Sequence, residues 1–279
     1  ASSPLGGSSA TFGTPVPVFS DPDIHFHSPR FDTDASSFSD FYVYVVASGS
    51  DDTGQDIWFA RSTNQGTSFE TSYRIAELLV SDRFYGQPDI SYGYGGHLHV
   101  VWEFGAYDDA FDQSIRYRRA SNYASAGLGS WDYWDVMTST SDGFDDGRAI
   151  VHASSVGDEV ILAYRRLDAG DVYEDTRVFV SSDAGASFPT NAVIPANVGQ
   201  PGDVAEDPTS GTWTLSGLMF SNYGITTAHV SDLSDWCDAL HFNDEWGAST
   251  YWYRPDVAVD PTRGNRVAMT WVTAYAESP

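Results

Sequence analysis

Three arginines stand where their side chains could act together on one ligand. Arg30, Arg148 and Arg254 each lie at the start of a short segment in which apolar and polar residues alternate. A guanidinium group presents a planar fork of donors that holds a carboxylate through two hydrogen bonds. Three such groups converging on one mouth would form a clamp for an acidic ligand. The alternative is that each arginine pairs with a nearby Asp or Glu and relieves repulsion in an acidic chain.

Acidic residues recur at one place in a repeated pattern. They form three loop clusters: Asp51, Asp52 and Asp56; Asp108, Asp109 and Asp112; and Asp168, Asp171 and Asp175. Several carboxylates in one loop offer the oxygen ligands that Ca²⁺ takes. The sequence therefore predicts calcium, and no other cofactor, at one or more of these loops. The alternative needs no metal, because Asp is common in turns, where its side chain bonds its own backbone.

Other residues of catalytic or metal-binding type form no distinctive set. Glycoside hydrolysis needs two carboxyl groups about 5 to 10 Å apart, and the candidates are Asp34, Glu103, Glu206 and Glu245. Two histidine pairs share a strand face at i and i+2, which suits zinc but lacks a third ligand: His25 with His27, and His97 with His99. The only cysteine, Cys237, forms no internal disulfide and is interpreted as a small buried side chain.

Charge narrows the classes of partner. The 279-residue chain carries 39 Asp and Glu against 14 basic residues, all of them Arg, and its formal net charge is −25. Nucleic acid and anionic membrane surfaces repel such a chain, and no stretch approaches the roughly 18 apolar residues of a membrane span. A strongly acidic chain of this kind stays soluble by repulsion between its copies, binds divalent cations, or is adapted to high salt, where the repulsion is screened. The small, polar residues 1–10 favour a mature terminus after signal removal, which predicts a secreted or cell-surface protein.

The elements that must position these residues are strands that repeat along the chain. Five similar ten-residue segments lie 53 to 62 residues apart: 41–50, 97–106, 159–168, 212–221 and 266–275. A shorter strand precedes each ten-residue segment. Four of the five segments are followed by a third strand that ends in Ser, and in most of these four units a fourth strand comes next. A unit of four antiparallel strands cannot bury both sheet faces alone, so the units must pack against one another around an axis.

The sequence therefore predicts an all-β fold, a five-bladed β-propeller of four-stranded antiparallel blades. After a flexible segment at 1–14, residues 15–279 form a single propeller with approximate blades at 28–80, 87–137, 147–195, 200–243 and 254–279. The fifth blade is short, and an open sheet edge invites pairing. We expect residues 15–19, a Pro-containing edge strand, to close the ring as part of the last blade. A neighbouring chain could complete that blade by strand addition.

Two turns between third and fourth strands carry the most specific motif. The first contains Ser62, Asn64, Gly66 and Phe69, and the second contains Ser181, Asp183, Gly185 and Phe188. In such a turn the Ser and Asx side chains accept backbone N–H bonds, Gly supplies positive φ and the aromatic ring packs between sheets. The pattern resembles the Asp box, or BNR repeat, of the sialidase-like propeller family. In that family the motif stabilises the fold and takes no part in the reaction.

The resemblance implies sialidase chemistry only in part. A catalytic member has a Phe/Tyr-Arg-Ile-Pro strand before its first Asp box, whereas here the similar string at 73–76 follows the first box and lacks Pro. The sequence thus favours a secreted, non-catalytic propeller that binds glycans or assembles with copies of itself into a surface polymer. The alternative is an exo-acting glycoside hydrolase of sialidase type with diverged motifs, in which the three arginines would form the carboxylate clamp.

Overall fold

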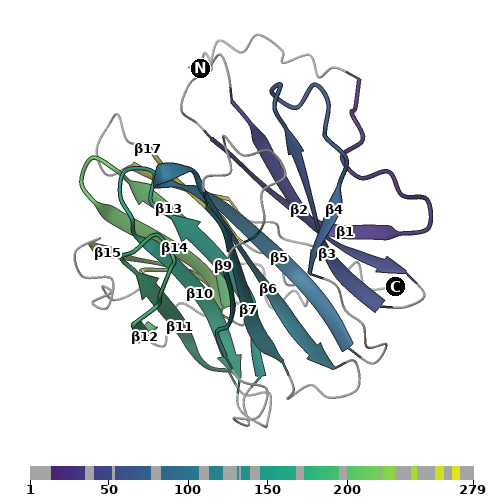
Figure 1. The fold of residues 1–279 in the computed structure, drawn as a ribbon. Coiled ribbons are helices and arrows are strands. Elements are labelled where there is room, and N and C mark those ends of the chain that lie inside the picture. The colour runs from purple at the N-terminus through teal and green to yellow at the C-terminus, as the bar shows by residue number, and fades with distance from the viewer. Residues whose placement is uncertain are drawn as a thin grey trace, which may run out of the picture.

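The protein is described here from a computed structural model, which defines residues 14–34, 41–51, 54–76, 83–106, 113–121, 131, 133–138, 145–167, 173–194, 200–219, 222–229, 240–243, 255–260 and 266–270 (Figure 1). Most of these residues lie in strands, as the alternating sequence pattern predicts. The one helical turn, η1 (Tyr94–Gly96), is a 3₁₀ turn. Within the described ranges no helix is long and apolar enough to cross a membrane.

The strands form antiparallel sheets, each built from consecutive segments of the chain. The first sheet contains β1 (His25–Thr33), β2 (Val43–Asp51), β3 (Gly54–Ser62) and β4 (Tyr73–Ala76). The second contains β5 (Arg83–Gly93), β6 (His97–Ala106), β7 (Ser114–Ala120) and β8 (Tyr133–Val136). The third contains β9 (Asp145–Ala153), β10 (Val160–Leu167), β11 (Tyr173–Ser181) and β12 (Thr190–Ile194).

The last two sheets continue the same order. The fourth contains β13 (Gln200–Asp207), β14 (Thr212–Met219), β15 (Asn222–His229) and β16 (Leu240–Asn243). The described part of the fifth is the pair β17 (Asp256–Asp260) and β18 (Arg266–Thr270). The first strands of consecutive sheets contact each other in the series β1, β5, β9, β13 and β17. This series places one strand of every sheet along a common centre, as a propeller requires (Figure 1).

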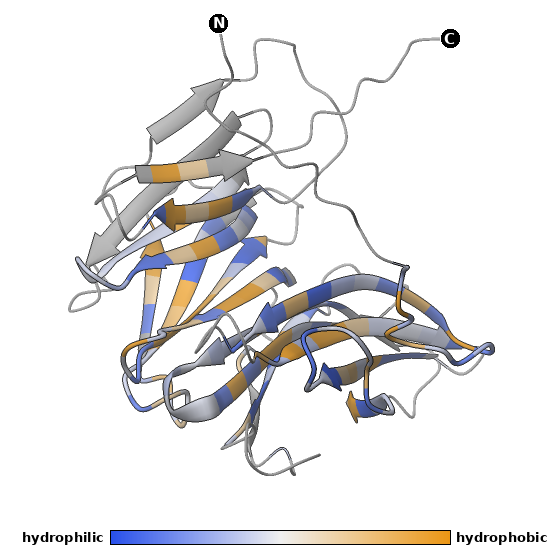
Figure 2. Ribbon diagram, turned by 90° about the horizontal axis from the view of Figure 1, so that it is seen from above, coloured by the Kyte–Doolittle hydropathy of each residue, from blue (hydrophilic) through white to orange (hydrophobic). Residues whose placement is uncertain are grey.

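The core lies between the sheets, because each middle sheet buries both faces. In β10, Leu162 packs toward the second sheet and Ile161 packs toward the fourth. A third cluster joins the first and second sheets around Tyr44, Phe59 and Trp102, all fully buried. Apolar residues accordingly recur along strands of neighbouring sheets (Figure 2). Consecutive residues of a strand such as β10, which point to opposite faces of the sheet, are therefore both apolar. In a sheet with one face in solvent, apolar and polar residues would alternate.

The first strands of the first four sheets, β1, β5, β9 and β13, each carry a bulge near their start. The register shifts between His27 and Arg30 in β1, and equivalent shifts interrupt β5, β9 and β13. The bulge residues Ser28, Gln87 and Arg148 have positive φ values of 51°, 44° and 57°. A bulge bends its strand and re-aims the side chains that follow it. The residues just after the bulges line one cavity between these strands.

The two Ser-x-Asx-x-Gly turns have the same internal bonding. The Ser62 hydroxyl accepts the Gly66 N–H at 2.9 Å, and the Ser181 hydroxyl accepts the Gly185 N–H at 2.9 Å. Both glycines have positive φ, 77° and 74°. The second turn also docks on the second sheet, since the Arg119 side chain donates to the Ala184 carbonyl at 2.9 Å. The turns thus close hairpins locally, and the second one also joins neighbouring sheets.

Residues 15–19, expected to close the ring as an edge strand, form no strand in the described part of the chain. Residues 14–24 form no strand, and Phe19 stacks on Phe26 of β1 with ring centroids 4.8 Å apart. Phe31 of β1 occupies the position at which Ile90, Val151 and Val204 pack on the preceding sheet, yet it is 72% exposed. Aromatic packing therefore joins Phe19 to its own sheet, because Phe26 in turn packs edge-on against Trp58.

Candidate functional site

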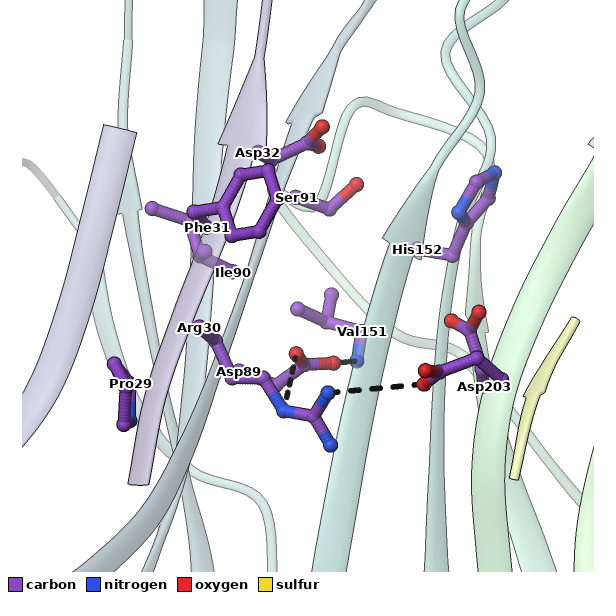
Figure 3. Close-up of a pocket in the computed structure, with 11 residues that line it drawn as sticks. Pro29, Arg30, Phe31, Asp32, Asp89, Ile90, Ser91, Val151, His152 and Asp203 are labelled. Atoms are coloured by element: carbon purple, nitrogen blue, oxygen red, sulfur yellow. Dashed lines mark hydrogen bonds and ion pairs between the residues drawn. The ribbon is translucent and has the colours of Figure 1, made fainter. Parts of the chain in front are cut away.

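A cavity of about 370 Å³ lies where the first strands of all five sheets meet (Figure 3). Its polar lining comes from the first strand of every sheet: Arg30 and Asp32 of β1, Asp89 and Ser91 of β5, His152 of β9, Asp203 of β13 and Asp256 of β17. Apolar walls come from Phe31, Ile90 and Val151. We call this space the axial cavity. A second cavity, of about 870 Å³, shares Asp32, Ser91 and His152 with it, so the two spaces meet at this layer.

Arg30 bridges the two ends of the strand series. Its Nε lies 4.0 Å from Oδ1 of Asp89, and its Nη1 lies 3.9 Å from Oδ1 of Asp256. Figure 3 shows the guanidinium group beside the Asp89 carboxylate. Both ion pairs are long and partly exposed, so each contributes little to stability. The two ion pairs affect the charge of the cavity, because the guanidinium group of Arg30, the single described cation there, is already shared by two carboxylates.

The carboxyl groups of the cavity also join neighbouring sheets. Asp32 accepts the Tyr92 N–H at 2.7 Å, and Asp89 accepts the Val151 N–H at 3.0 Å. Asp203 accepts the Val257 N–H at 3.2 Å. Each bond runs from one central strand to the next. A backbone donor that would otherwise be buried without a partner is satisfied in this way, so these carboxyls have a structural role whatever else they do.

Burial changes the protonation of this site. Desolvation raises the pKa of Asp32 to about 6 and that of Asp203 to about 7, and the Asp89 charge adds to both shifts. Desolvation lowers the pKa of His152 to about 4, although the Glu206 charge opposes the shift. At neutral pH the imidazole is therefore uncharged, and Asp203 exchanges its proton near neutrality. A carboxyl of this kind can donate a hydrogen bond or act as a general acid.

Asp32, Ser91 and His152 have the composition of a nucleophilic triad but not its connectivity. A triad needs the imidazole between the carboxylate and the hydroxyl. Here the Ser91 side chain bonds to Asp32, and its hydroxyl also accepts the Ala153 N–H at 3.0 Å. Within the described ranges no hydrogen bond reaches either ring nitrogen of His152. The arrangement therefore leaves Ser91 unactivated and His152 open to a ligand.

The predicted arginine clamp does not assemble among the described residues. Arg30 lines the axial cavity, but Arg148 does not. The Arg148 side chain donates to Oε1 of Gln87, and its N–H donates to Oε1 of Glu103. Its positive φ shows the reason, because Arg148 is itself the bulge residue of β9. Arg254 lies outside the described residues.

The predicted carboxylates are dispersed. Asp34 accepts the Tyr42 N–H at 2.5 Å beside the first sheet. Glu103 is buried beside the β9 bulge. Glu206 lies at the second cavity, where it accepts the Ser154 hydroxyl at 2.7 Å. Glu245 lies outside the described residues. No pair of these residues faces the axial cavity.

The described members of the acidic loops are bound to arginines. Asp56 lies 3.1 Å from Nε of Arg74, and Asp175 holds Arg177 through bonds of 2.9 to 3.1 Å. Asp51 lies 3.8 Å from Arg74. Across the described part of the chain, no three acidic, histidine or cysteine side chains are grouped so that they could hold a metal ion. The remaining loop members lie outside the described residues: Asp52, Asp108, Asp109, Asp112, Asp168 and Asp171. Calcium binding stays a prediction.

The histidine pairs serve different environments. His25 and His27 are exposed on β1. His99 is buried, and its Nδ1 lies 2.7 Å from the Tyr117 hydroxyl, which in turn donates to the Gly185 carbonyl at 3.3 Å. His99 thus supports the contact between the second and third sheets. Cys237 lies outside the described residues.

The sequence reasoning missed most of the axial residues. Asp89, Asp203 and Asp256 occupy one position of the repeat, next to an apolar residue, in the strings Pro-Asp-Ile, Gly-Asp-Val and Pro-Asp-Val. That recurrence was the signal for a shared site. His152 carries no such signal, because the repeat has other residues at its position.

Comparison with known proteins supports the fold. No protein-family model and no curated protein matches the sequence. Among solved structures, a Hadza microbial sialidase matches with a TM-score of 0.56 and 13% identity over 85% of this chain and 50% of its own. A NanB sialidase variant from Streptococcus pneumoniae matches with a TM-score of 0.62 and 9% identity over 88% and 57%. The α-L-arabinofuranosidase of Fusarium graminearum matches with a TM-score of 0.58 and 15% identity. This match covers 83% of this chain and 67% of the arabinofuranosidase.

These structures are propeller-type glycoside hydrolases, and the low identities mean that the likeness shows the fold alone. The chain spans about half to two-thirds of the length of these three proteins. It has a sialidase-like β-propeller fold.

Proposed function

We propose that this chain is a glycan-binding propeller, secreted or at the cell surface, that holds one sugar unit in the axial cavity without cleaving it. The observation that carries the proposal is the axial cavity itself. Its volume of about 370 Å³ lies within the usual range for small-molecule sites. It combines hydrogen-bonding groups from several sheets with an apolar wall. The structural neighbours that act on sialosides or arabinofuranosides agree with a sugar ligand.

The charge of the cavity favours an uncharged or positively charged sugar over a sialoside. The cavity contains Asp32, Asp89, Asp203 and Asp256, and Arg30 is its one described cation. A sialoside carboxylate would meet a guanidinium that is already shared by Asp89 and Asp256. Bringing a further negative charge into a partly desolvated acidic site is unfavourable. The proposal therefore departs from the substrate that the neighbouring sialidases bind.

Binding without cleavage follows from how the carboxyls are bonded. Asp32 and Asp203 each accept two backbone N–H bonds, and those bonds orient both groups toward neighbouring strands. A retaining or inverting hydrolase needs one carboxyl as acid and a second as nucleophile or base on either side of the scissile bond. In the axial cavity the second group, Asp89, is joined to Val151 and Arg30.

One specific observation supports a second candidate function. The raised pKa of Asp203 suits a general acid at neutral pH, so an exo-acting glycoside hydrolase remains the alternative. In that case Asp203 would protonate the leaving group and Asp89 would act as the second carboxyl. The sugar would enter the cavity by one end.

The same proposal extends to assembly. We infer a five-bladed ring, in which a neighbouring chain completes the fifth sheet beside β18. Light scattering after size-exclusion chromatography tests this part separately, since a stable monomer at all concentrations contradicts it. Calcium binding in the acidic loops is tested by calorimetric titration of the chelated protein with CaCl₂.

The binding proposal is tested by titrating the protein with methyl glycosides and with 3′-sialyllactose. We expect saturable binding of an uncharged or amino sugar and no binding of the sialoside. Arg30→Gln alters the cavity, and Asp23→Asn is the matched control, since Asp23 is exposed on the segment before β1. Binding that is unchanged by Arg30→Gln contradicts the axial location.

Release of 4-nitrophenol from aryl glycosides separates the two candidate functions. We expect no release. Turnover that is lost in Asp203→Asn and kept in Asp23→Asn would establish the hydrolase instead.

A further inference from the structure

We propose that the second cavity binds the apolar aglycone of a glycoside whose sugar unit occupies the axial cavity. This inference rests on the proposed glycan binding and names the class of ligand. Asp32, Ser91 and His152 line both cavities, so the two spaces share one layer of side chains. Figure 3 shows these three side chains in the upper part of the view, above Arg30 and Asp89 of the axial cavity. A ligand longer than one sugar unit would reach past this layer into the second cavity.

The two cavities are spaced for one elongated ligand. Along β5 and η1, residues 89–91 line the axial cavity and residues 91–95 line the second cavity. The middle residues of these two stretches, Ile90 and Gly93, are three positions apart in β5, which corresponds to about 10 Å at the rise of a strand. A sugar ring that carries an alkyl chain or an aromatic ring extends over a distance of this order.

The wall of the second cavity is mainly apolar beyond the shared layer. Its volume of about 870 Å³ lies within the range of small-molecule sites. Apolar and aromatic side chains from the second, fourth and fifth sheets line it: Tyr92, Tyr94, Val204, Val257, Ala258 and Val259. An apolar group that leaves water for such a wall gains free energy in proportion to the area it buries. The wall therefore favours an apolar aglycone.

A second sugar unit fits this wall less well than an apolar group does. Beyond the shared layer and the tyrosine hydroxyls, the polar side chains that line the described wall are Thr33, Ser155 and Glu206. The Ser155 hydroxyl donates to Glu206 at 3.3 Å, and Glu206 also accepts the Ser154 hydroxyl at 2.7 Å. These groups are thus already bonded to one another. Sugar hydroxyls that lose water without gaining a partner cost free energy.

The rim of the second cavity is fixed by hydrogen bonds between three sheets. The Tyr94 N–H of η1 donates to the Ser154 carbonyl at 2.8 Å, which joins the second sheet to the third. The Ser155 N–H donates to Glu206 of β13 at 3.0 Å, which joins the third sheet to the fourth. The Tyr94 side chain is nevertheless 54% exposed, so its ring does not serve to fill the core. An aromatic ring held in this way offers a preformed apolar contact at the rim.

The experiment compares glycosides that share a sugar and differ in the aglycone, by isothermal titration calorimetry. The probes are the methyl and hexyl β-D-glucopyranosides, the methyl and hexyl β-D-galactopyranosides, methyl β-cellobioside and hexan-1-ol, all below micellar concentrations. We expect a hexyl glycoside to bind about tenfold or more tightly than the methyl glycoside of the same sugar, because each methylene group that leaves water adds to the affinity. Its heat-capacity change on binding should also be more negative, which is the mark of apolar burial.

Two variants locate the effect. Tyr94→Ala removes the exposed ring and keeps the backbone bond of that residue, and Val259→Glu places a carboxylate where the equivalent position of β13 already has Glu206. Each should reduce the affinity for the hexyl glycoside by about fivefold or more and leave that for the methyl glycoside within about twofold.

The matched control is Val193→Ala. Val193 is 51% exposed on β12, the outermost strand of the third sheet, and lines neither cavity. This variant should change neither affinity. Circular dichroism melting of each variant shows that it is folded before it is titrated.

The outcomes separate this inference from the proposed function. Equal binding of the methyl and hexyl glycosides overturns the aglycone site and leaves glycan binding standing, whereas absence of binding for every probe overturns both. Hexan-1-ol or methyl β-cellobioside that binds as tightly as a hexyl glycoside overturns the assignment to an apolar aglycone. A hexyl gain that neither variant reduces contradicts the location in the second cavity. A gain that both variants reduce, with weaker binding of the other two probes, supports the inference.

Discussion

Arg30 of β1 and Asp256 of β17 form an ion pair of 3.9 Å, which joins the first and the last of the described sheets. The two residues are 226 positions apart in the chain, yet they occupy equivalent positions in two copies of one repeat. Asp89, the other partner of Arg30, occupies the same position in a third copy. One repeated position therefore supplies most of the charged groups of the axial cavity and a contact between the first and the last described sheets.

Arg30→Gln should reduce the free energy of unfolding by about 1 kcal/mol or less. The Arg30 and Asp256 side chains are 33% and 63% exposed, and ion pairs in such surroundings contribute little. Urea denaturation followed by tryptophan fluorescence measures the change. A loss of several kcal/mol would mean that ring closure depends on this pair rather than on the packing between sheets.

Asp203→Ala should destabilise the protein far more than Asp203→Asn. The alanine variant leaves the Val257 and Val204 N–H groups without their acceptor, at a cost of about 1 to 3 kcal/mol for each buried group. The asparagine side chain keeps one carbonyl oxygen and can still accept from Val257. The free energies of unfolding of both variants, measured by urea denaturation at pH 7, test the difference. Equal values would show that the hydrogen bond between Asp203 of β13 and Val257 of β17 does not stabilise the protein.

The stability difference between Asp203→Asn and the unmodified protein should depend on pH. The folded pKa of Asp203 is about 7, above its ordinary value of 3.8, so the folded protein retains a proton that the unfolded chain releases. Protonation therefore stabilises the folded state, and this stabilisation is lost as pH rises from about 4 to about 7. Asp32, with a pKa of about 6, acts in the same direction.

The measurement for this prediction is the free energy of unfolding of both proteins at pH 4.5 and pH 8. The variant should gain relative to the unmodified protein by more than about 1 kcal/mol at the higher pH, since one pKa unit corresponds to about 1.4 kcal/mol. His99 and His152, whose pKa values burial lowers, act in the opposite direction in both proteins and cancel in the difference. A constant difference across this range would contradict the raised pKa of Asp203.

Gly185→Ala should be more harmful than Gly66→Ala. Both glycines have similar positive φ, 74° and 77°, so alanine is strained in both turns by about 1 to 2 kcal/mol. A Cβ on Gly185 would also collide with the Tyr117 hydroxyl and crowd His99, whereas nothing lies within 4 Å of a Cβ on Gly66. Thermal melting of the two variants therefore isolates the docking of the second turn on its neighbour sheet. Equal effects would show that this contact is unimportant.

Much of the fold could be predicted from local patterns. The strands around β2, β6, β10 and β14 follow from alternating apolar residues bounded by Gly, Asp and Ser. The turns at Ser62 and Ser181 follow from side chains that bond within five residues of themselves. The prediction of an edge strand at residues 15–19 is wrong, because a short Pro-containing segment has no local signal that separates sheet pairing from the aromatic packing seen at Phe19.

The candidate site is harder to predict from the sequence, because it depends on the direction in which each side chain points from its strand and not only on the residue type. Arg148 has the right chemistry for a clamp, but it is the bulge residue of β9 and bonds Gln87 instead. Asp203 has the same chemistry as the Asp residues in the loops, but its strand directs it to the axis. The half-buried position of His152 arises from its contact with Trp213 and from strands far away in the chain that line the same cavity.

The amino-acid sequence by itself determined the strand repeat, the serine turns and the strongly acidic character, since these depend on neighbours within a few residues and on composition. Only the tertiary structure decided which carboxyls share one cavity and which are neutralised by arginines. The physical reason is that a bulge of one residue reverses the face that a strand side chain points to. Burial by another sheet then sets its charge.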